Sequence, residues 1–455
     1  MSDAGVGAAR NDGARPGFAE AARVWARIGI LSFGGPAGQI ALMHRVLVEE
    51  KKWISERRFL HALNFCMLLP GPEAMQLATY VGWLLHRTRG GVVAGALFVL
   101  PGFAILLALS TLYALFRQTD WLASVFFGLK AAVLAIVVDA VFRIGRRALK
   151  TPAAVVIAAL AFAGIFVFRV PFPAIVLGAG LAGIVGVGLY PGLLADPRHG
   201  AADDTDDGLP SPVEPSLRRA LRVVVTWGAL WAAPVLPAGL ILGWGSIYPA
   251  LAVFFSWMAV VTFGGAYAVL AYVAEAAVAT FGWLEPGQML DGLALAETTP
   301  GPLILVLTFV GFIAAFGDPG SLPPLVAGLL GATLVTWVTF VPCFLWIFLS
   351  APYVETLHGN RRLSGGLAAI TAAVVGVILN LALYLGLHVL FREVGELALG
   401  PARPAWPVWA TLDPWALGLT AVAALALIGL RLGIVPTLAL SAVLGLVVRL
   451  LVPAI

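Results

Sequence analysis

Long apolar segments separated by short polar stretches make up most of this 455-residue chain. A helix needs about 20 apolar residues to cross the hydrocarbon core of a membrane, and these segments are long enough for spans or half-spans. Charged residues are only 11% of the chain, against roughly 25% in a soluble domain. We therefore predict an all-α polytopic membrane protein. The segments cover residues 18–43, 59–86, 92–116, 122–142, 152–168, 172–194, 217–243, 249–275, 289–315, 324–350, 364–391, 413–430 and 433–453.

Two polar stretches divide the chain. Residues 1–17 lack the apolar core of a cleavable signal peptide and are predicted to be a disordered cytoplasmic tail. Residues 195–216 are acidic and rich in proline, which is the composition of a linker. The sequence thus predicts a first repeat at 18–194, a connecting span at 217–243 and a second repeat at 244–455. The net charge of +4 is spread over short loops, so we expect no nucleic-acid partner.

The second half repeats the first at a fixed spacing, which indicates two homologous repeats. A later pair of matches, Pro101 with Pro342 and Asp139 with Asn380, lies at an offset of 241 and shows that one loop has grown. The matches at an offset of 230 are Ser32-Phe33-Gly34-Gly35 with Thr262-Phe263-Gly264-Gly265, Trp53 with Trp283, and Pro70-Gly71-Pro72 with Pro300-Gly301-Pro302.

These repeated motifs predict broken helices inside the membrane. Proline removes a backbone donor and clashes with the preceding turn, so Pro70-Gly71-Pro72 must interrupt its helix. Freed N–H and C=O groups cannot face lipid, so such a break should be buried in protein or line a wet cavity. Each half carries two breaks, which makes them candidate binding sites.

The loop charges bear on how the halves are oriented. If every segment crosses, the odd number of segments up to the connecting span turns the second half upside down, and the thirteen segments become thirteen crossings. Basic loops that are swapped between the halves also favour inverted repeats and a cytoplasmic N-terminus. The basic cluster from Arg45 to Arg58 would then lie on the outer side of the membrane, against this assignment. It lies on the cytoplasmic side only if the Gly34-Gly35 segment re-enters and returns to the side from which it came. If both equivalent segments re-enter, eleven crossings and parallel halves remain open.

Several longer motifs resemble the chromate ion transporter family, in its long two-domain form, over nearly the whole chain. The first half carries Phe33-Gly34-Gly35-Pro36 with Gln39, and Leu69-Pro70-Gly71-Pro72-Glu73 through Trp83. The second carries Thr299-Pro300-Gly301-Pro302 with Phe309-Val310-Gly311-Phe312. The resemblance implies a plasma-membrane carrier, of the bacterial inner-membrane type, that exports chromate, with sulfate as a related oxyanion, using the membrane potential or a proton gradient.

Backbone chemistry at the breaks is compatible with an oxyanion. A helix that restarts after a break presents unpaired N–H groups and the positive end of its dipole, which suits a tetrahedral anion. The alternative is that these motifs only kink helices or allow close packing. Candidate substrate-binding residues are Gly34, Gly35, Pro70, Gly71, Pro72, Gln76, Lys130, Gly264, Gly265, Thr299, Pro300, Gly301 and Pro302.

Two acids are candidates for proton coupling. Glu73 follows the first Pro-Gly-Pro motif, where it is also a favourable dipole partner, and its repeat mate is Leu303. Glu297 precedes the second motif, opposite Met67 in the repeat. A carboxylate beside an anion site repels the substrate unless it is protonated, so coupling is the role we expect.

Lys130 offers a fixed cation within the membrane but can instead extend toward the interface. Asp139 and Arg143 are one turn apart, which predicts a structural ion pair. Amides and hydroxyls near the breaks either bind substrate or satisfy freed backbone groups.

A passive oxyanion channel, or a carrier of another small anion, is the alternative function. An intramembrane enzyme is less favoured because the sequence has no P-loop, paired zinc histidines or nucleophile elbow. No cofactor and no metal is indicated. The expected partners are a small oxyanion, protons and the lipid bilayer, and a homodimer is left open.

Overall fold

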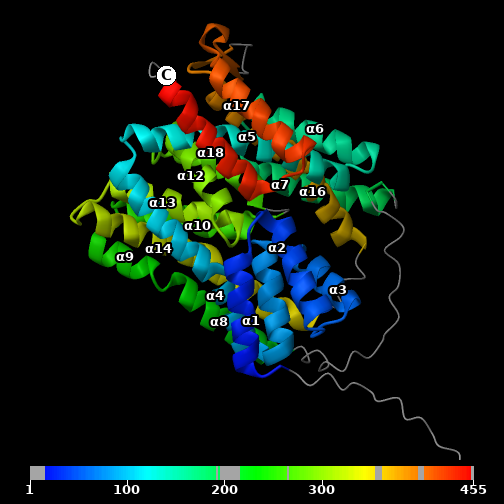
Figure 1. Cartoon of the computed structure of the whole chain (residues 1–455). Helices are drawn as coiled ribbons and strands as arrows, with labels where there is room; N and C mark the ends of the chain where they lie inside the picture. The colour runs from blue at the N-terminus through cyan, green and yellow to red at the C-terminus, as the bar shows by residue number, and fades with distance from the viewer. Residues whose placement is uncertain are drawn as a thin grey trace, which may run out of the picture.

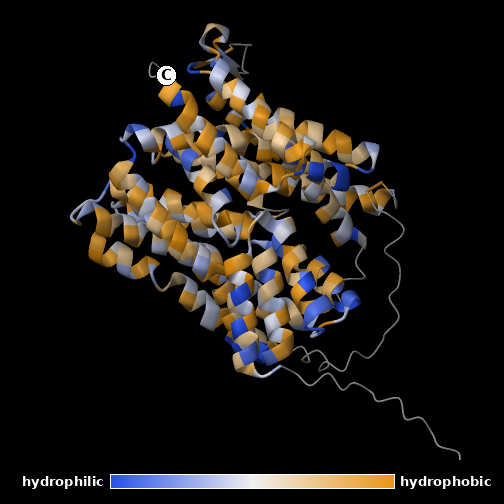
Figure 2. Ribbon diagram, in the orientation of Figure 1, coloured by the Kyte–Doolittle hydropathy of each residue, from blue (hydrophilic) through white to orange (hydrophobic). Residues whose placement is uncertain are grey.

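The chain is an all-α polytopic membrane protein, as the sequence predicts (Figure 1). The computed structural model describes residues 16–190, 193–194, 216–263, 266–353, 361–397 and 404–451. Most of the predicted tail and linker, together with Gly264 and Gly265, lie outside these described residues. Seven of the described helices are long and apolar enough to cross a membrane. Apolar residues cover much of the outer helices (Figure 2).

The first half is a run of helices with two early interruptions. A π-helical turn, η1 (Arg45–Glu50), follows the second helix, and α4 bends sharply at His86 and Arg87, where its backbone is not helical. Because of this bend, residues 73–85 pack back against the long second part of α4, with Gly82 against Gly90. The helices are α1 (Phe18–Leu31), α2 (Gly35–His44), α3 (Glu56–Cys66), α4 (Glu73–Phe116), α5 (Asp120–Ala148), α6 (Pro152–Phe166) and α7 (Phe172–Leu189).

The connecting span is α8 (Leu217–Ala232) with α9 (Val235–Leu242), and the second half follows it. Its short elements are η2 (Ala276–Thr280), η3 (Leu303–Leu305), η4 (Ala351–Tyr353), η5 (Trp409–Thr411), η6 (Leu425–Gly429) and a two-stranded hairpin, β1 (Val394–Glu396) with β2 (Ala405–Pro407). Its helices are α10 (Ile247–Val261), α11 (Ala266–Glu275), α12 (Pro286–Thr298), α13 (Val306–Gly317), α14 (Pro324–Ser350), α16 (Arg361–Leu390), α17 (Pro414–Ala424) and α18 (Ile434–Leu451).

The order of elements repeats between the halves. Helices α1, α2 and α3 correspond to α10, α11 and α12, and each half has a π-helical turn at the equivalent place. The two parts of α4 correspond to α13 and α14, and α5 corresponds to α16. The sequence offset therefore reflects two copies of one arrangement of helices.

The first broken segment does not cross the bundle. Lys51, just after η1, forms an ion pair with Glu20 in the first turn of α1, with Nζ and Oε1 2.8 Å apart. The chain therefore enters along α1, turns at Ser32 to Gly34, and returns along α2 to the end at which it began. The thirteen-crossing prediction is wrong here, because 14 residues of α1 and 10 of α2 together have the apolar length of one span.

The Pro-Gly-Pro segment also folds back on itself. Phe65 at the end of α3 and Tyr80 in α4 have ring centroids 5.0 Å apart, although fifteen residues separate them. His86 at the bend of α4 contacts the carbonyl of Pro16, which precedes α1, with Nε2 2.8 Å from the oxygen. Both broken segments of the first half thus approach the interior from one end of the bundle.

The two halves are interlocked rather than side by side. Helix α5 packs against α17 and α18 of the second half, and its equivalent α16 packs against α6 and α7 of the first. Where they meet, α5 and α16 run antiparallel, with Gly145 beside Val375 and Leu134 beside Gly386. The same holds for α4 and α14, where Gly91 meets Phe348 and Gly95 meets Phe344. Glycines on these faces let the helices approach closely.

Candidate functional site

The breaks of the two halves meet in reciprocal pairs. The backbone N–H of Gly71 donates to the carbonyl of Thr262 at 2.8 Å, and that of Gly301 donates to the carbonyl of Ser32 at 2.9 Å. Each Pro-Gly-Pro motif is therefore bonded to the end of the helix before the Gly-Gly motif of the other half. These two bonds satisfy backbone groups that lipid cannot satisfy.

The central glycines fit this arrangement because of their backbone and their neighbours. Gly71 has φ +121° and Gly301 has φ +93°, conformations that residues with a side chain rarely adopt. The motif at Gly301 packs against Gly102, where an added Cβ would lie 2.1 Å from the carbonyl oxygen of Pro300. The motif at Gly71 meets Cys343, the repeat mate of Gly102, at 3.1 Å from an added Cβ. Each break thus rests on the other half.

Helices restart directly after the breaks without side-chain caps. The N-cap positions of α4, η3 and α2 are Pro72, Pro302 and Gly34, and none makes a capping hydrogen bond through a side chain. The first N–H groups of a helix have no partner inside the helix. No side chain of the described residues caps the N–H groups of Glu73 and Leu303, and a role for them in binding an oxyanion stays a prediction.

The side-chain amides near the breaks bind backbone carbonyls. Gln39 Nε2 donates to the carbonyl of Gly301 at 2.6 Å and so joins the halves, while Gln76 Nε2 donates to that of Pro70 at 2.6 Å. Thr299 bonds the carbonyl of Ala296 in the same way. The amide oxygens of the two glutamines, Gln39 Oε1 and Gln76 Oε1, are buried and accept no hydrogen bond from the described residues. A buried unpaired acceptor is costly, so these oxygens mark places for a donor.

The two candidate acids have different surroundings. Glu297 is 4% exposed and accepts a hydrogen bond from the hydroxyl of Tyr267, with Oε1 and Oη 3.0 Å apart. Arg143 interacts electrostatically with this pair and forms the expected ion pair with Asp139 at 2.9 Å. Glu73, by contrast, makes no hydrogen bond or ion pair with any described residue.

Tyr267 connects Glu297 to a break of the first half. A Cβ built on Gly35 would lie 3.8 Å from Tyr267 Oη, so the hydroxyl is adjacent to the Gly34-Gly35 backbone. Arg143 also has an unused donor, because its Nε is buried and makes no hydrogen bond with the described residues. The chemistry near the breaks therefore includes a carboxyl, a phenol and a cation.

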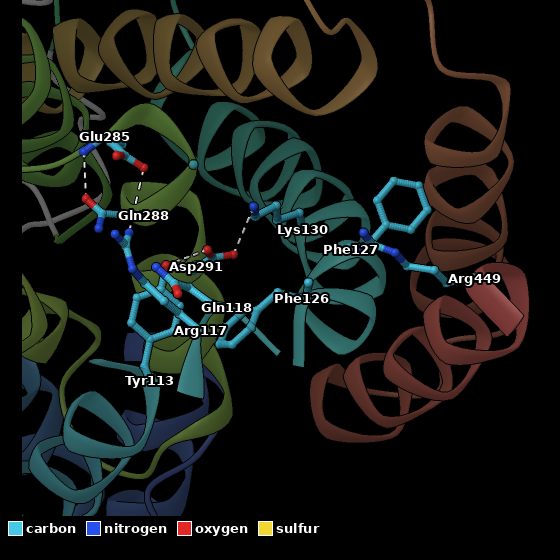
Figure 3. A pocket seen from close by; sticks show the side chains of 12 residues that line it. Tyr113, Arg117, Gln118, Phe126, Phe127, Lys130, Glu285, Gln288, Asp291 and Arg449 are labelled. Carbon is cyan, nitrogen blue, oxygen red and sulfur yellow. Dashed lines mark hydrogen bonds and ion pairs between the residues drawn. The ribbon is translucent and has the colours of Figure 1, made fainter. Parts of the chain in front are cut away.

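Lys130 lies in a different place from the breaks. Its Nζ is 3.0 Å from Asp291 Oδ1, and Tyr113 Oη donates to Asp291 Oδ2 at 2.8 Å (Figure 3). These residues line a cavity of about 440 Å³ together with Arg117, Gln118, Ala123, Phe126, Phe127, Glu285, Gly287, Gln288 and Arg449. None of the described Pro-Gly-Pro or Gly-Gly residues is among them.

Sequence reasoning did not single out Tyr267 and Asp291 as site residues. Tyr267 is a polar ring two residues after the second Gly-Gly motif, and Asp291 is a carboxylate within an apolar helical run. An ionisable residue inside a membrane segment is a functional candidate by default, so Asp291 carried a usable signal.

Comparison with known proteins agrees with these motifs. The family model described as chromate transporter matches residues 19–184 and 249–446, which together form both repeats. The chain is 36% identical over 360 residues to a chromate transport protein of Pseudomonas aeruginosa, covering 77% of each chain. It is 30% identical over 362 residues to a probable chromate transport protein of Synechococcus elongatus, covering 79% of this chain and 82% of the relative.

A third relative is the chromate transport protein of Cupriavidus metallidurans, 30% identical over 357 residues, with 77% of this chain and 78% of the relative covered. No solved structure matches the chain significantly. The family model spans both halves, including every described break, and the relatives match at similar length. The chain is thus a member of the chromate transporter family.

Proposed function

We propose that this protein is a secondary active transporter that exports chromate, and also sulfate, across the bacterial inner membrane. The observation that carries the proposal is the reciprocal bonding of the breaks, Gly71 to Thr262 and Gly301 to Ser32. The proposal takes the uncapped helix starts of both halves to face the substrate path, where their N–H groups and helix dipoles favour a tetrahedral oxyanion. The names of the relatives supply the substrate.

An inverted relation between the halves is part of the proposal. Because the Pro-Gly-Pro segment folds back as well, the crossings before the second half are the second part of α4, α5, α6, α7 and the connecting span, which is an odd number. Equivalent helices run antiparallel where they touch, as inverted repeats require. Re-entry of the first segment also brings the basic cluster from Arg45 to Arg58 back to the end of α1 that bears Glu20. This cluster then lies on the same side as the other basic loops, as the charge rule requires. A cytoplasmic N-terminus then agrees with the basic loops around Arg87 and Arg147.

Exchange between an inward and an outward state follows from this geometry. Each break is bonded to the opposite half, so rocking one half against the other alters both pairs at once. Arg143, which pairs with Asp139 and interacts electrostatically with Glu297, is the proposed cation that attracts the dianion toward the breaks. The driving force is the membrane potential or the proton gradient, and Glu73 and Glu297 are the proposed proton carriers.

Chromate flux in everted membrane vesicles tests this proposal. A leucine in place of Gly301 places a bulky side chain against Leu305 and the carbonyl of Phe98, so Gly301→Leu should abolish uptake into the vesicles. Gly228→Leu in α8 is the matched control, because no atom lies within 4 Å of its Cβ position. We expect flux of the control to equal that of the unaltered protein.

The outcomes separate the possible roles. Full flux in Gly301→Leu would return the break to a packing role and remove it from the substrate path. Chromate currents under voltage clamp that do not respond to an imposed proton gradient would favour a passive channel or potential-driven uniport over proton coupling. Flux of sulfate but not chromate would keep the carrier and change its substrate.

A further inference from the structure

The cavity around Lys130 is a candidate for a second binding site, separate from the breaks. Its volume of about 440 Å³ lies within the range of small-molecule sites. Its lining comes from both halves, with Tyr113, Arg117 and Lys130 from the first and Asp291 and Arg449 from the second. A site at such a junction responds to any movement of one half against the other.

The charges in this cavity favour an anion. Among the described residues that line it, three are basic, Arg117, Lys130 and Arg449, and two are acidic, Glu285 and Asp291. Arg449 extends from α18 toward α5 beside Phe127 (Figure 3) and has no hydrogen bond or ion pair with any described residue. Arg117 Nη1 is 3.7 Å from Glu285 Oε2, which is beyond hydrogen-bond distance. This ion pair therefore occupies the five N–H donors of Arg117 only weakly.

An exchange of partners by Lys130 leaves the buried Asp291 carboxylate without its countercharge. Asp291 keeps only the hydrogen bond from Tyr113 Oη at 2.8 Å when Lys130 turns to another anion. Breaking a buried ion pair is costly because the remaining charge is uncompensated. A dianion therefore displaces Asp291 only with the added charge of Arg449 and Arg117, which makes this a weak site.

The position of the cavity relates it to the proposed transport path. Asp291 and Glu297 lie on the same helix, α12, six residues or about 9 Å apart along its axis. The cavity is reached from the end of the bundle at which α4 ends, opposite the Glu20–Lys51 pair. It is thus an entrance or exit beside the break region on one side of the protein.

We propose that this cavity is an access site for a tetrahedral oxyanion dianion such as chromate, in which the ion replaces Asp291 as the partner of Lys130 and contacts Arg449 and Arg117. The proposal rests on the proposed transport function. It assigns this cavity a weaker, transient occupancy, and the breaks the tighter one.

Equilibrium dialysis of purified full-length protein against radiolabelled chromate tests the access site. In phosphatidylcholine nanodiscs we expect two classes of bound chromate. Arg449→Gln should weaken the weaker class about tenfold, the effect of losing one charge-assisted hydrogen bond, and Arg449→Lys should restore part of it. Asp291→Asn should strengthen this class severalfold because Lys130 loses its competing carboxylate. Arg222→Gln, in α8 and outside the cavity, is the matched control.

The results distinguish the access site from the proposed function. One class of chromate that Arg449→Gln leaves unchanged overturns the access site and leaves binding at the breaks intact. No bound chromate in the unaltered protein overturns both. A weaker class that phosphatidylglycerol displaces, with the displacement lost in Arg449→Gln, makes the cavity a lipid-phosphate site and also overturns the proposal. If Asp291→Asn does not fold, the Arg449 variants alone decide whether the access site exists.

Discussion

The two halves share a backbone design at their breaks but differ in the side chains around them. Gly71 and Gly301 each donate to the opposite half, and each packs against the equivalent residue of the other, Cys343 or Gly102. The polar side chains do not follow this symmetry. Gln76 and Glu73 of the first half have Val306 and Leu303 as repeat mates, and Tyr267 and Glu297 of the second have Ala37 and Met67.

This difference separates the structural role of the duplicated glycines from the chemical role of the unduplicated polar side chains. Backbone hydrogen bonds across the halves are needed twice, because each break frees groups that lipid cannot satisfy. A proton-carrying acid or a substrate-facing cation is needed only where the transport path passes. We therefore expect substitutions at the duplicated glycines to act alike in both halves, and substitutions at the unduplicated side chains to act differently.

The largest effect is expected from Gly71→Ala and Gly301→Ala. Both residues have positive φ, so an alanine is strained by about 1–3 kcal/mol, and its Cβ meets Gln76 Nε2 at 2.9 Å or Leu305 Cδ1 at 3.0 Å. Chromate flux should fall by more than about tenfold in each variant. Flux in vesicles and thermal unfolding followed by tryptophan fluorescence measure the two effects.

Gly228→Ala is the control for these variants. It lies in α8 with open space at its Cβ position, and alanine favours a helix interior over glycine by about 0.5–1 kcal/mol. Its flux should be unchanged. If only one of the two break variants loses flux, the breaks are not equivalent and the symmetric part of the comparison fails.

The next effect concerns the unduplicated acids. Glu297→Gln keeps the shape of the side chain but removes a charge that interacts with Tyr267 and Arg143. Glu73→Gln removes a charge with no polar partner among the described residues. We expect both to weaken the dependence of flux on an imposed proton gradient, with chromate binding retained in Glu73→Gln and strengthened severalfold in Glu297→Gln, because Arg143 loses a competing carboxylate.

Gradient-dependent flux and equilibrium binding, measured on the same preparations, separate these expectations. Proton-driven flux at the original rate in both variants would remove the two carboxyls from coupling. Equal changes of binding in both would show that Glu73 has the same role as Glu297, against the asymmetry described above.

The amide variants come third. Gln39→Leu leaves the carbonyl of Gly301 with one bond fewer across the halves, and Gln76→Leu does the same to Pro70 within one half. Each should destabilise the protein by about 1–3 kcal/mol, with the larger loss of flux in Gln39→Leu because that bond joins the halves. Thr333→Val, which removes an exposed hydroxyl on α14, should change neither quantity. A larger loss of flux in Gln76→Leu would contradict this order.

Much of the fold could be predicted from the sequence because its signals are local or periodic. Apolar length predicts membrane helices, and proline with glycine predicts breaks wherever the motif occurs. The offset of 230 predicts two copies of one arrangement. The number of crossings could not be predicted this way, because the apolar length of α1 with α2 equals that of one span, and only the Glu20–Lys51 contact reveals the turn.

The site was harder to predict because its partners lie far apart in the chain. Lys130 is predicted from the sequence as a candidate substrate-binding cation, with extension toward the interface as the alternative, and only packing of α5 against α12 shows that it pairs with Asp291 in a separate cavity. Arg143 was correctly paired with Asp139 at one-turn spacing, yet its proximity to Glu297 depends on two distant segments. Helical spacing predicts neighbours on one helix, whereas contacts between helices depend on the tertiary arrangement.

The smallest effect is expected from Tyr267→Phe, which tests the hydroxyl that links Glu297 to the Gly34-Gly35 break. The substitution removes one hydrogen bond to a buried carboxyl, worth about 1 kcal/mol, so chromate flux should fall about fivefold while the fold is retained. Tyr272→Phe on the same helix is the matched control, because the hydroxyl of Tyr272 makes no hydrogen bond with the described residues. Flux in Tyr267→Phe equal to that of Tyr272→Phe would show that Glu297 acts without its phenol partner. A loss of flux as large as that of Glu297→Gln would instead mean that the hydroxyl and the carboxyl act as one unit. The first half lacks this unit, because Ala37 and Met67 occupy the equivalent positions.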